Sequence, residues 1–248
     1  MSEVLGIDIG GTGIKAGLVD CNAGQFTSDI KRMATPVQSE PEQLTEVLAK
    51  MVNSFDWTGP VGIGYPGVVI NGRTFSAAHL SDEWIEADAL NLFSQIIPNP
   101  LSLINDADAA GLAEMKFGAG REHNCPSGGS VLMLTFGTGI GSALFYNGLL
   151  FPNSELGHLL VGEASAEDRA AGKVKTDLGL TWEASAVRLN LVLAEYEKLL
   201  SPELIIIGGG LSEKYDQFSS MINCRANVLA AELKNEEGII GAALHCQS

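Results

Sequence analysis

The sequence predicts an α/β protein of two lobes in which one supersecondary unit occurs twice. Apolar runs typical of strands alternate along the chain with segments of helical apolar spacing, such as residues 182–200. Two pairs of strands enclose a turn of glycine and threonine, Gly10-Gly-Thr-Gly13 and Gly137-Thr-Gly139. A chain of 248 residues is long enough for two lobes, each with its own core.

A polar, glycine-containing connector at residues 121–129 predicts the lobe boundary. Residues 1–120 are then a small N-terminal lobe, which a C-terminal helix at about residues 236–248 joins. Residues 121–235 are the large C-terminal lobe.

Composition and charge limit the partners. The net charge is −15, from 30 acidic and 15 basic residues, which disfavours nucleic acid and anionic membrane as partners. No window approaches the roughly 18 unbroken apolar residues of a membrane span, and the first residues lack a basic and apolar leader. The four cysteines are scattered, with no Cys-x-x-Cys pair. We therefore expect a cytoplasmic protein.

The first glycine turn lies between two strands, residues 4–9 and 14–19. Dinucleotide-binding and Walker-type loops need a helix directly after the glycines, so both are excluded. Bare backbone, a hydroxyl and a cation suit a phosphate group at Gly10, Gly11, Thr12 and Lys15. Asp8 suits a water-mediated contact to a metal ion. The alternative is an ordinary glycine-rich hairpin with an aspartate at the strand end.

The rest of the first lobe alternates further elements. A helix begins at Pro41, and the strand at residues 61–65 ends in Pro66-Gly67, after which residues 68–70 start a hairpin arm. Residues 75–84 lack periodicity and are predicted to be a loop that could line a cleft, although loops usually only cover the surface. Residues 88–97 are predicted to be helical.

Asp106 stands where a buried strand, residues 101–104, gives way to a helix, residues 107–117. Ligands of open α/β sheets collect at the carboxyl ends of strands, so Asp106 is a candidate catalytic base. The alternative is that Asn105, Asp106 or Asp108 only caps the helix.

The second glycine turn follows the same pattern, with strands at residues 130–135 and 140–145. One phosphate-binding hairpin in each lobe points to a cleft that closes on a phosphoryl chain. Glu155 and His158 then flank a glycine that can aim both side chains at one point, although a lone histidine is more often structural.

The remaining elements are a short helix at residues 164–172, which contains Glu167, and a long one at 182–200. Residues 203–207 are a buried strand. Gly208-Gly-Gly210 follows it and is predicted to lead into a helix, an arrangement that suits a base or sugar on bare backbone. The C-terminal helix carries Gly241, which permits close packing.

Five motifs in this order resemble those of the ROK (repressor, open reading frame, kinase) sugar kinases. They are Asp8-x-Gly-Gly-Thr-x-x-Lys15, Asn105-Asp106, Phe136-Gly-Thr-Gly-x-Gly141, Glu155-x-Gly-His158 and Gly208-Gly-Gly210. The resemblance runs from Val4 to Leu244 and implies the two-lobed actin-like ATPase, ribonuclease H-like fold with duplicated phosphate-binding β-hairpins.

Within the family the sequence is most similar to the polyphosphate-dependent glucokinases, notably over Tyr65-Pro-Gly-Val-Val69 and Asn105-Asp-Ala-Asp-Ala-Ala-Gly-Leu-Ala-Glu114. The wider family carries a zinc site with a cysteine cluster, but no cysteine lies between Cys125 and Cys224, so we expect no zinc site. Repressor members carry a DNA-binding segment before the first motif, for which we expect no room here.

The resemblance implies a kinase that phosphorylates glucose at the 6-hydroxyl, with Asp106 as the base. The sugar-binding residues would be Asn105, Gly67, Glu155, His158 and, by analogy alone, Glu167. The phosphate-binding residues would be Asp8, Gly10, Gly11, Thr12, Lys15, Gly137, Thr138 and Gly139. Gly208, Gly209 and Gly210 would bind a nucleotide, and Mg²⁺ would lie near Asp8.

The expected donor is inorganic polyphosphate, perhaps alongside ATP, and we expect a homodimer. Basic residues could form a track for the polyanion, or could be scattered solvated charges: Lys15, Lys116, Arg121, Arg169, Lys173 and Lys175. The alternatives are a strictly ATP-dependent glucokinase or other hexose kinase, and a non-catalytic sugar sensor.

Overall fold

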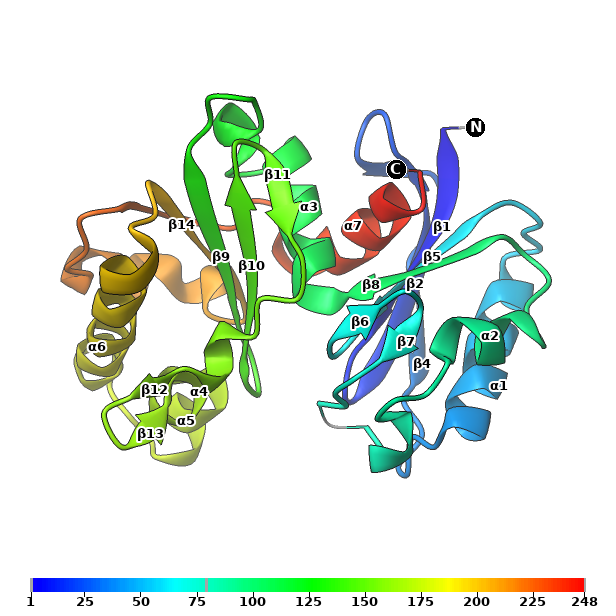
Figure 1. Ribbon diagram of the computed structural model, residues 1–248, viewed down its shortest axis with the longest axis horizontal. Coiled ribbons are helices and arrows are strands. Elements are labelled where there is room, and N and C mark those ends of the chain that lie inside the picture. Colours follow the sequence, from blue (N-terminus) through cyan, green and yellow to red (C-terminus); the bar gives the residue numbers. More distant parts are fainter. Residues whose placement is uncertain (1, 79, 248) are drawn as a thin grey trace. The chain divides into compact units, whose positions relative to one another are not determined.

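The computed structural model describes residues 2–78 and 80–247, and the chain in it divides into two compact units (Figure 1). One unit comprises Met1–Ala113 and Glu236–Ser248, and the other comprises Glu114–Asn235. The division falls inside helix α3 (Asp106–Phe117), whereas the sequence predicts it after that helix, at residue 120. Residue 79 of the loop expected at 75–84, and the two terminal residues, lie outside the described part.

The first unit is built on a six-stranded sheet with the order β3-β2-β1-β5-β8, and β4 also pairs with β2. The strands are β1 (Glu3–Ile9), β2 (Gly13–Asp20), β3 (Gln25–Phe26), β4 (Lys31–Ala34), β5 (Val61–Tyr65) and β8 (Leu101–Asn105). Strands β1 and β2 form the antiparallel hairpin predicted around Gly10-Gly-Thr-Gly13, while β1, β5 and β8 run parallel. A second small hairpin joins β6 (Val69–Ile70) to β7 (Arg73–Thr74).

Alternate residues of β1 face different helices. Leu5, Ile7 and Ile9 belong to the core that includes helices α1 (Pro41–Ser54) and α2 (Ala89–Ser94). Helix α7 (Glu237–His245) covers the other face, where a Cβ added at Gly6 would lie 2.1 Å from the Ile239 carbonyl oxygen. The C-terminal helix therefore packs on this sheet at backbone contact, which the small residues permit.

The predicted loop at residues 75–84 contributes to the core instead of only covering it. Its last residues form a 3₁₀ turn, Asp82–Trp84, and the Trp84 side chain is fully buried between Tyr65 and Phe93. The indole nitrogen of Trp84 donates to the Ser39 carbonyl at 2.8 Å. The expectation that this segment lines a cleft is therefore wrong for Trp84.

The second unit repeats the strand pattern of the first. Its sheet has the order β11-β10-β9-β14-β15, in which β9 and β10 form the predicted antiparallel hairpin and β14 and β15 run parallel to β9. The strands are β9 (Ser130–Phe136), β10 (Ile140–Tyr146), β11 (Leu149–Phe151), β14 (Leu204–Gly209) and β15 (Asn227–Ala230). The hairpin followed by two parallel strands thus occurs in both units, in the same order.

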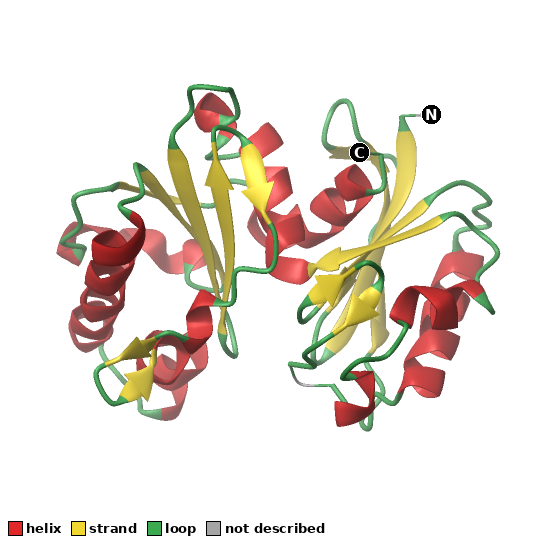
Figure 2. Cartoon of the chain, viewed as in Figure 1, coloured by secondary structure: helices red, strands yellow, loops and turns green. Residues whose placement is uncertain are grey.

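Helices and a two-stranded sheet complete the second unit (Figure 2). Helix α6 (Trp182–Leu200) supplies its apolar side to the core that contains Leu132 and Leu134 of β9. The short helix predicted at 164–172 is present as α4 (Ala166–Ala170) but is shorter than expected, because its first two residues form a strand and a second short helix begins at Gly172. The other elements of this segment are β12 (Leu160–Val161), β13 (Ala164–Ser165) and α5 (Gly172–Asp177).

The helix predicted after Gly208-Gly-Gly210 is wrong. The segment forms two 3₁₀ turns, Ser212–Gln217 and Ser219–Met221. In the first turn, the backbone angles of Lys214 lie outside the helical region. Among the described residues, no helix is both long enough and apolar enough to span a membrane.

Candidate functional site

The turn between β8 and α3 gives Asn105 and Asp106 different tasks. Asn105 is buried, and its Oδ1 accepts the N–H of Asp108 at 2.9 Å while its Nδ2 donates to the Gly67 carbonyl at 3.0 Å. Asp106 is half-buried, and its Oδ1 accepts the N–H of Ala107 at 2.8 Å. Asn105 therefore caps the helix, and Asp106 stands at the carboxyl end of a buried parallel strand.

Gly67 positions Asn105 by its backbone. Its φ of 155° belongs to the region that favours glycine, and a Cβ there would lie 2.6 Å from the Ser76 carbonyl oxygen. Ser76 holds the same loop by accepting the N–H of Val68 at 2.8 Å and the hydroxyl of Tyr65 at 3.2 Å. The loop that carries Gly67 is thus fixed, and with it the amide of Asn105.

The first glycine turn is closed by its own backbone. The N–H of Gly10 donates to the Gly13 carbonyl at 3.0 Å, and the Thr35 hydroxyl donates to the Gly10 carbonyl at 2.6 Å. Gly11 and Thr12 are exposed at the tip of the turn. Their backbone and hydroxyl groups are therefore accessible to a phosphate group.

Asp8 and Lys15 face each other across the first hairpin, as partners in the β1–β2 register. Burial raises the pKa of Asp8, and the nearby Lys15 cation acts against that rise. A Cβ added at Gly238 would lie 2.9 Å from the Asp8 carboxyl carbon, so α7 closes over this carboxylate. The result is a partly desolvated acid beside a cation.

The donor set around Asp8 fits Mg²⁺ only as a partial site. No group of three His, Cys, Asp or Glu side chains within residues 2–78 and 80–247 is arranged to hold a metal ion. Mg²⁺ commonly binds one or two carboxylates and completes its shell with waters and substrate phosphates. Asp8 can supply such a carboxylate, and a cation there would offset the desolvation that raises its pKa.

The two glycines of the second turn, Gly137 and Gly139, have different surroundings. The N–H of Gly137 donates to the Gly139 carbonyl, and the N–H of Lys173 donates to the Gly137 carbonyl, both at 3.0 Å. A Cβ at Gly137 would meet open space, but one at Gly139 would lie 2.6 Å from Glu167 Oε2. Glycine at position 139 therefore lets Glu167 approach the turn.

Glu155, His158 and Glu167 form one cluster. The Nδ1 of His158 lies 3.3 Å from Glu167 Oε1, and its Nε2 lies 3.8 Å from Glu155 Oε2. The other oxygen of Glu167 accepts the N–H of Ile140 at 3.4 Å. Burial raises the pKa of Glu155, His158 lowers it and Glu167 raises it further. The structure thus brings together three predicted sugar-binding residues and ties them to the second glycine turn.

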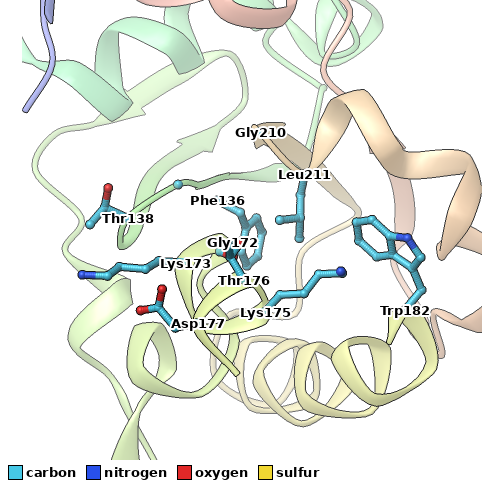
Figure 3. Close-up of a pocket in the computed structure, with 11 residues that line it drawn as sticks. Phe136, Thr138, Gly172, Lys173, Lys175, Thr176, Asp177, Trp182, Gly210 and Leu211 are labelled. Atoms are coloured by element: carbon cyan, nitrogen blue, oxygen red, sulfur yellow. The ribbon is translucent and has the colours of Figure 1, made fainter. Parts of the chain in front are cut away.

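A cavity of about 510 Å³ opens beside the same turn (Figure 3). Its lining combines the second glycine turn, the short helix α5, the start of α6 and the two residues that follow β14. The residues are Phe136, Gly137, Thr138, Gly172, Lys173, Lys175, Thr176, Asp177, Trp182, Gly210 and Leu211. Two lysines against one aspartate make it a cationic hollow in a chain of net charge −15.

The cavity divides the basic residues considered in the sequence analysis. Lys173 and Lys175 line it, whereas the Arg121 guanidinium lies 2.7 Å from a Glu232 carboxylate oxygen and Lys116 lies over the Phe117 ring. Sequence patterns gave no indication of Trp182 as a cavity residue, because it marked only the start of an apolar helix.

The three glycines at the end of β14, Gly208 to Gly210, differ in their surroundings. Gly208 is buried in the strand, paired with Thr135, and Gly209 adopts a positive φ of 66° with Phe136 at close contact. Gly210 is the member of this group that lines the cavity.

The model of the ROK family matches residues 4–173. Polyphosphate glucokinase of Mycobacterium tuberculosis (strain CDC 1551 / Oshkosh) is 44% identical over 240 residues, which cover 96% of this chain and 89% of that protein.

Solved structures of sugar kinases share the fold of this chain. The inorganic polyphosphate/ATP-glucomannokinase of Arthrobacter sp. strain KM is 39% identical, with a TM-score of 0.93 and coverage of 100% of this chain and 99% of that one. The ROK family glucokinase of Streptomyces griseus, solved with glucose and AMPPNP, shares the fold with a TM-score of 0.82 at 24% identity, over 99% of each chain. The predicted two-lobed actin-like fold is confirmed, and the chain belongs to the ROK family.

Proposed function

We propose that the protein is a sugar kinase that transfers a phosphoryl group to the 6-hydroxyl of glucose, with inorganic polyphosphate or ATP as the donor. One observation carries the proposal. Glu167 contacts both the second glycine turn, through Ile140, and the cluster of His158 and Glu155. Hydroxyl-binding groups and a cationic cavity therefore share one turn, as transfer from a phosphate chain to a sugar requires. The names of the two most similar relatives described above support the same chemistry.

Asp106 is the proposed general base. It accepts the proton of the glucose 6-hydroxyl as that oxygen attacks the terminal phosphorus of the donor. The bond between this phosphorus and the bridging oxygen breaks, and the shortened polyphosphate or ADP leaves with the electron pair. Asn105 supplies the side-chain cap of α3 through the N–H of Asp108, while one carboxylate oxygen of Asp106 accepts the N–H of Ala107.

The remaining polar groups position the reactants. Asn105, Glu155, His158 and Glu167 bind the other sugar hydroxyls, and Gly67 holds Asn105 in place. The two glycine turns, Gly10 to Thr12 and Gly137 to Gly139, bind phosphates, together with Lys15. Gly208 to Gly210 border the position of a nucleotide. Mg²⁺, held in part by Asp8, would neutralise charge on the phosphates, and phosphoryl transfer depends mainly on such positioning and neutralisation.

The deciding experiment measures hexose 6-phosphate formation with polyphosphate or ATP as the sole donor. Glucose is the expected acceptor, and mannose is the second candidate because the similar Arthrobacter enzyme is named a glucomannokinase. Fructose and N-acetylmannosamine complete the panel. Turnover with ATP and none with polyphosphate would reduce the proposal to an ATP-dependent kinase. Sugar binding without product from either donor would favour a non-catalytic sensor.

Two further expectations belong to this proposal. A homodimer is checked by light scattering of the purified protein, and cytoplasmic localisation by fractionation of cells that express it.

A further inference from the structure

We propose that Lys175 and Trp182 select between the two phosphoryl donors, an inference that rests on the proposed kinase function. The cavity beside the second glycine turn has two chemically different ends. At one end lie Thr138 and Lys173, and at the other end lie Lys175 and the Trp182 indole (Figure 3). The two lysine side chains of α5 point in opposite directions, one toward each end.

The Trp182 ring is held by packing on one side. It stacks on Phe218 with ring centroids 5.4 Å apart and planes 14° from parallel. Phe218 is buried and does not line the cavity, whereas Lys175 does, and the Lys175 Nζ lies 4.1 Å from the Trp182 ring centroid. The cation therefore covers the indole from the cavity side, an arrangement that the ring quadrupole favours.

At the Lys175–Trp182 end of the cavity, a nucleobase and an inorganic phosphate chain would need different arrangements of the two side chains. A nucleobase gains most by stacking on the open face of an aromatic ring, and Lys175 must leave the indole for that to happen. The distal phosphates of an inorganic chain gain instead from a cation at this end, and they can bind Lys175 without needing the ring. Lys175 thus favours polyphosphate, and Trp182 favours ATP.

The pair lies outside the groups proposed to bind the sugar or the reacting phosphoryl group. Lys173 and Thr138 serve the end of the cavity that adjoins the glycine turn. A change at Lys175 should therefore alter the donor preference more than the acceptor chemistry. The quantity to follow is the ratio of kcat/KM for polyphosphate to kcat/KM for ATP.

The test compares Lys175→Met, which keeps the aliphatic stem and removes the charge, with Lys175→Arg, which keeps the cation. The control is Lys198→Met, because Lys198 is exposed on α6, pairs with Glu195 at 3.4 Å and does not line the cavity. We expect the donor ratio to fall about tenfold in Lys175→Met and to stay within about twofold in the other two variants. The slope of log KM for polyphosphate against log salt should also fall by roughly one counterion in Lys175→Met alone.

Trp182→Leu tests the other half of the proposal. Leucine keeps an apolar contact with Phe218 but offers no aromatic face, so the donor ratio should rise, with a KM for ATP that increases about tenfold. Circular dichroism and thermal unfolding identify a variant that fails to fold. Trp182→Phe then replaces it, and the smaller ring should shift the ratio in the same direction by less.

Binding of tripolyphosphate and of ADP, measured by calorimetry without glucose, gives a readout independent of turnover. Lys175→Met should weaken tripolyphosphate binding and leave ADP binding equal or tighter. Equal losses for both ligands, or the same change in Lys198→Met, would overturn the inference while leaving a kinase intact. A wild-type protein that forms no sugar phosphate with either donor would instead overturn the proposed function.

Discussion

Replacing Glu114 should destabilise the second unit strongly, because this buried carboxylate holds three backbone N–H groups. Its Oε2 accepts from Ala119 at 2.8 Å and from Glu232 at 3.1 Å, and its Oε1 accepts from Leu233 at 2.7 Å. The side chain is 0% exposed, and a Cβ at Gly118 would overlap it. One carboxylate thus joins Ala119, just after α3, to Glu232 and Leu233, near the C-terminal end of the unit.

The magnitude follows from the three bonds. A buried donor left without an acceptor costs about 1–3 kcal/mol, so Glu114→Ala could cost on the order of 3–9 kcal/mol. Water that reaches the exposed neighbourhood of Glu232 recovers part of this, and we expect about 3–5 kcal/mol. Glu114→Gln keeps one carbonyl oxygen but turns an amide donor toward an N–H, and it should cost about 1–3 kcal/mol.

The assay is urea unfolding of the whole chain, followed by circular dichroism and by tryptophan fluorescence. Glu122→Ala is the matched control, because Glu122 is exposed near the same end of α3 and the substitution removes the same charge. The control should remain within about 0.5 kcal/mol of wild type. A Glu114→Ala variant as stable as Glu122→Ala would refute the assignment of Glu114 as a backbone clamp.

Four further outcomes are expected. Asp106→Asn should lower kcat about 10²–10⁴-fold while glucose still binds, and near-normal turnover would exclude Asp106 as the base. Because burial raises the pKa of Glu155, its carboxylate takes up a proton at a higher pH than an ordinary glutamate, so the KM for glucose should rise as the pH falls through that raised pKa. A pH profile unchanged in Glu155→Gln would contradict this cause. Removing divalent ions with EDTA should abolish turnover, Mg²⁺ should restore it, and a zinc-selective chelator should have no effect on activity or on the circular dichroism spectrum. Gly241→Ala should lower the free energy of unfolding by about 1–3 kcal/mol or more, since its Cβ would lie 1.6 Å from the Ala109 carbonyl oxygen; unchanged stability in urea would show that α7 can shift away.

Local patterns predicted the hairpins correctly, and non-local contacts explain the errors. The glycine turns between apolar runs determined β1–β2 and β9–β10, because turn chemistry and strand alternation are both short-range properties. The burial of Trp84 depends on a carbonyl acceptor at Ser39, 45 residues away, which no periodicity records. The segment after Gly210 forms 3₁₀ turns instead of the expected helix, and a non-local contact holds it, since the Tyr215 hydroxyl donates to the Val228 carbonyl at 2.6 Å.

The candidate site shows the same division. Residue types and order indicated Asp106, Glu155 and His158 as candidates, and the family resemblance added Glu167. The structure gathers the last three into one cluster. The contact between Lys175 and Trp182 was not predictable, because it depends on how α5 and α6 pack across the turn that joins them. Tryptophan side chains are largely buried on average, so Trp182 gave no distinct signal.

The two hairpins repeat one topology but differ in charge at equivalent positions. In the first, Asp8 pairs with Lys15 across the strands, and in the second, Thr135 pairs with Gly141. The second hairpin therefore lacks both the acid and the cation, and its unit supplies cations from α5 instead. On the proposed function this difference has a consequence for catalysis. The hairpin with the carboxylate suits a metal ion at the reacting phosphates. The neutral hairpin, beside Lys173 and Lys175, suits a phosphate chain that ends either in further phosphates or in a nucleoside.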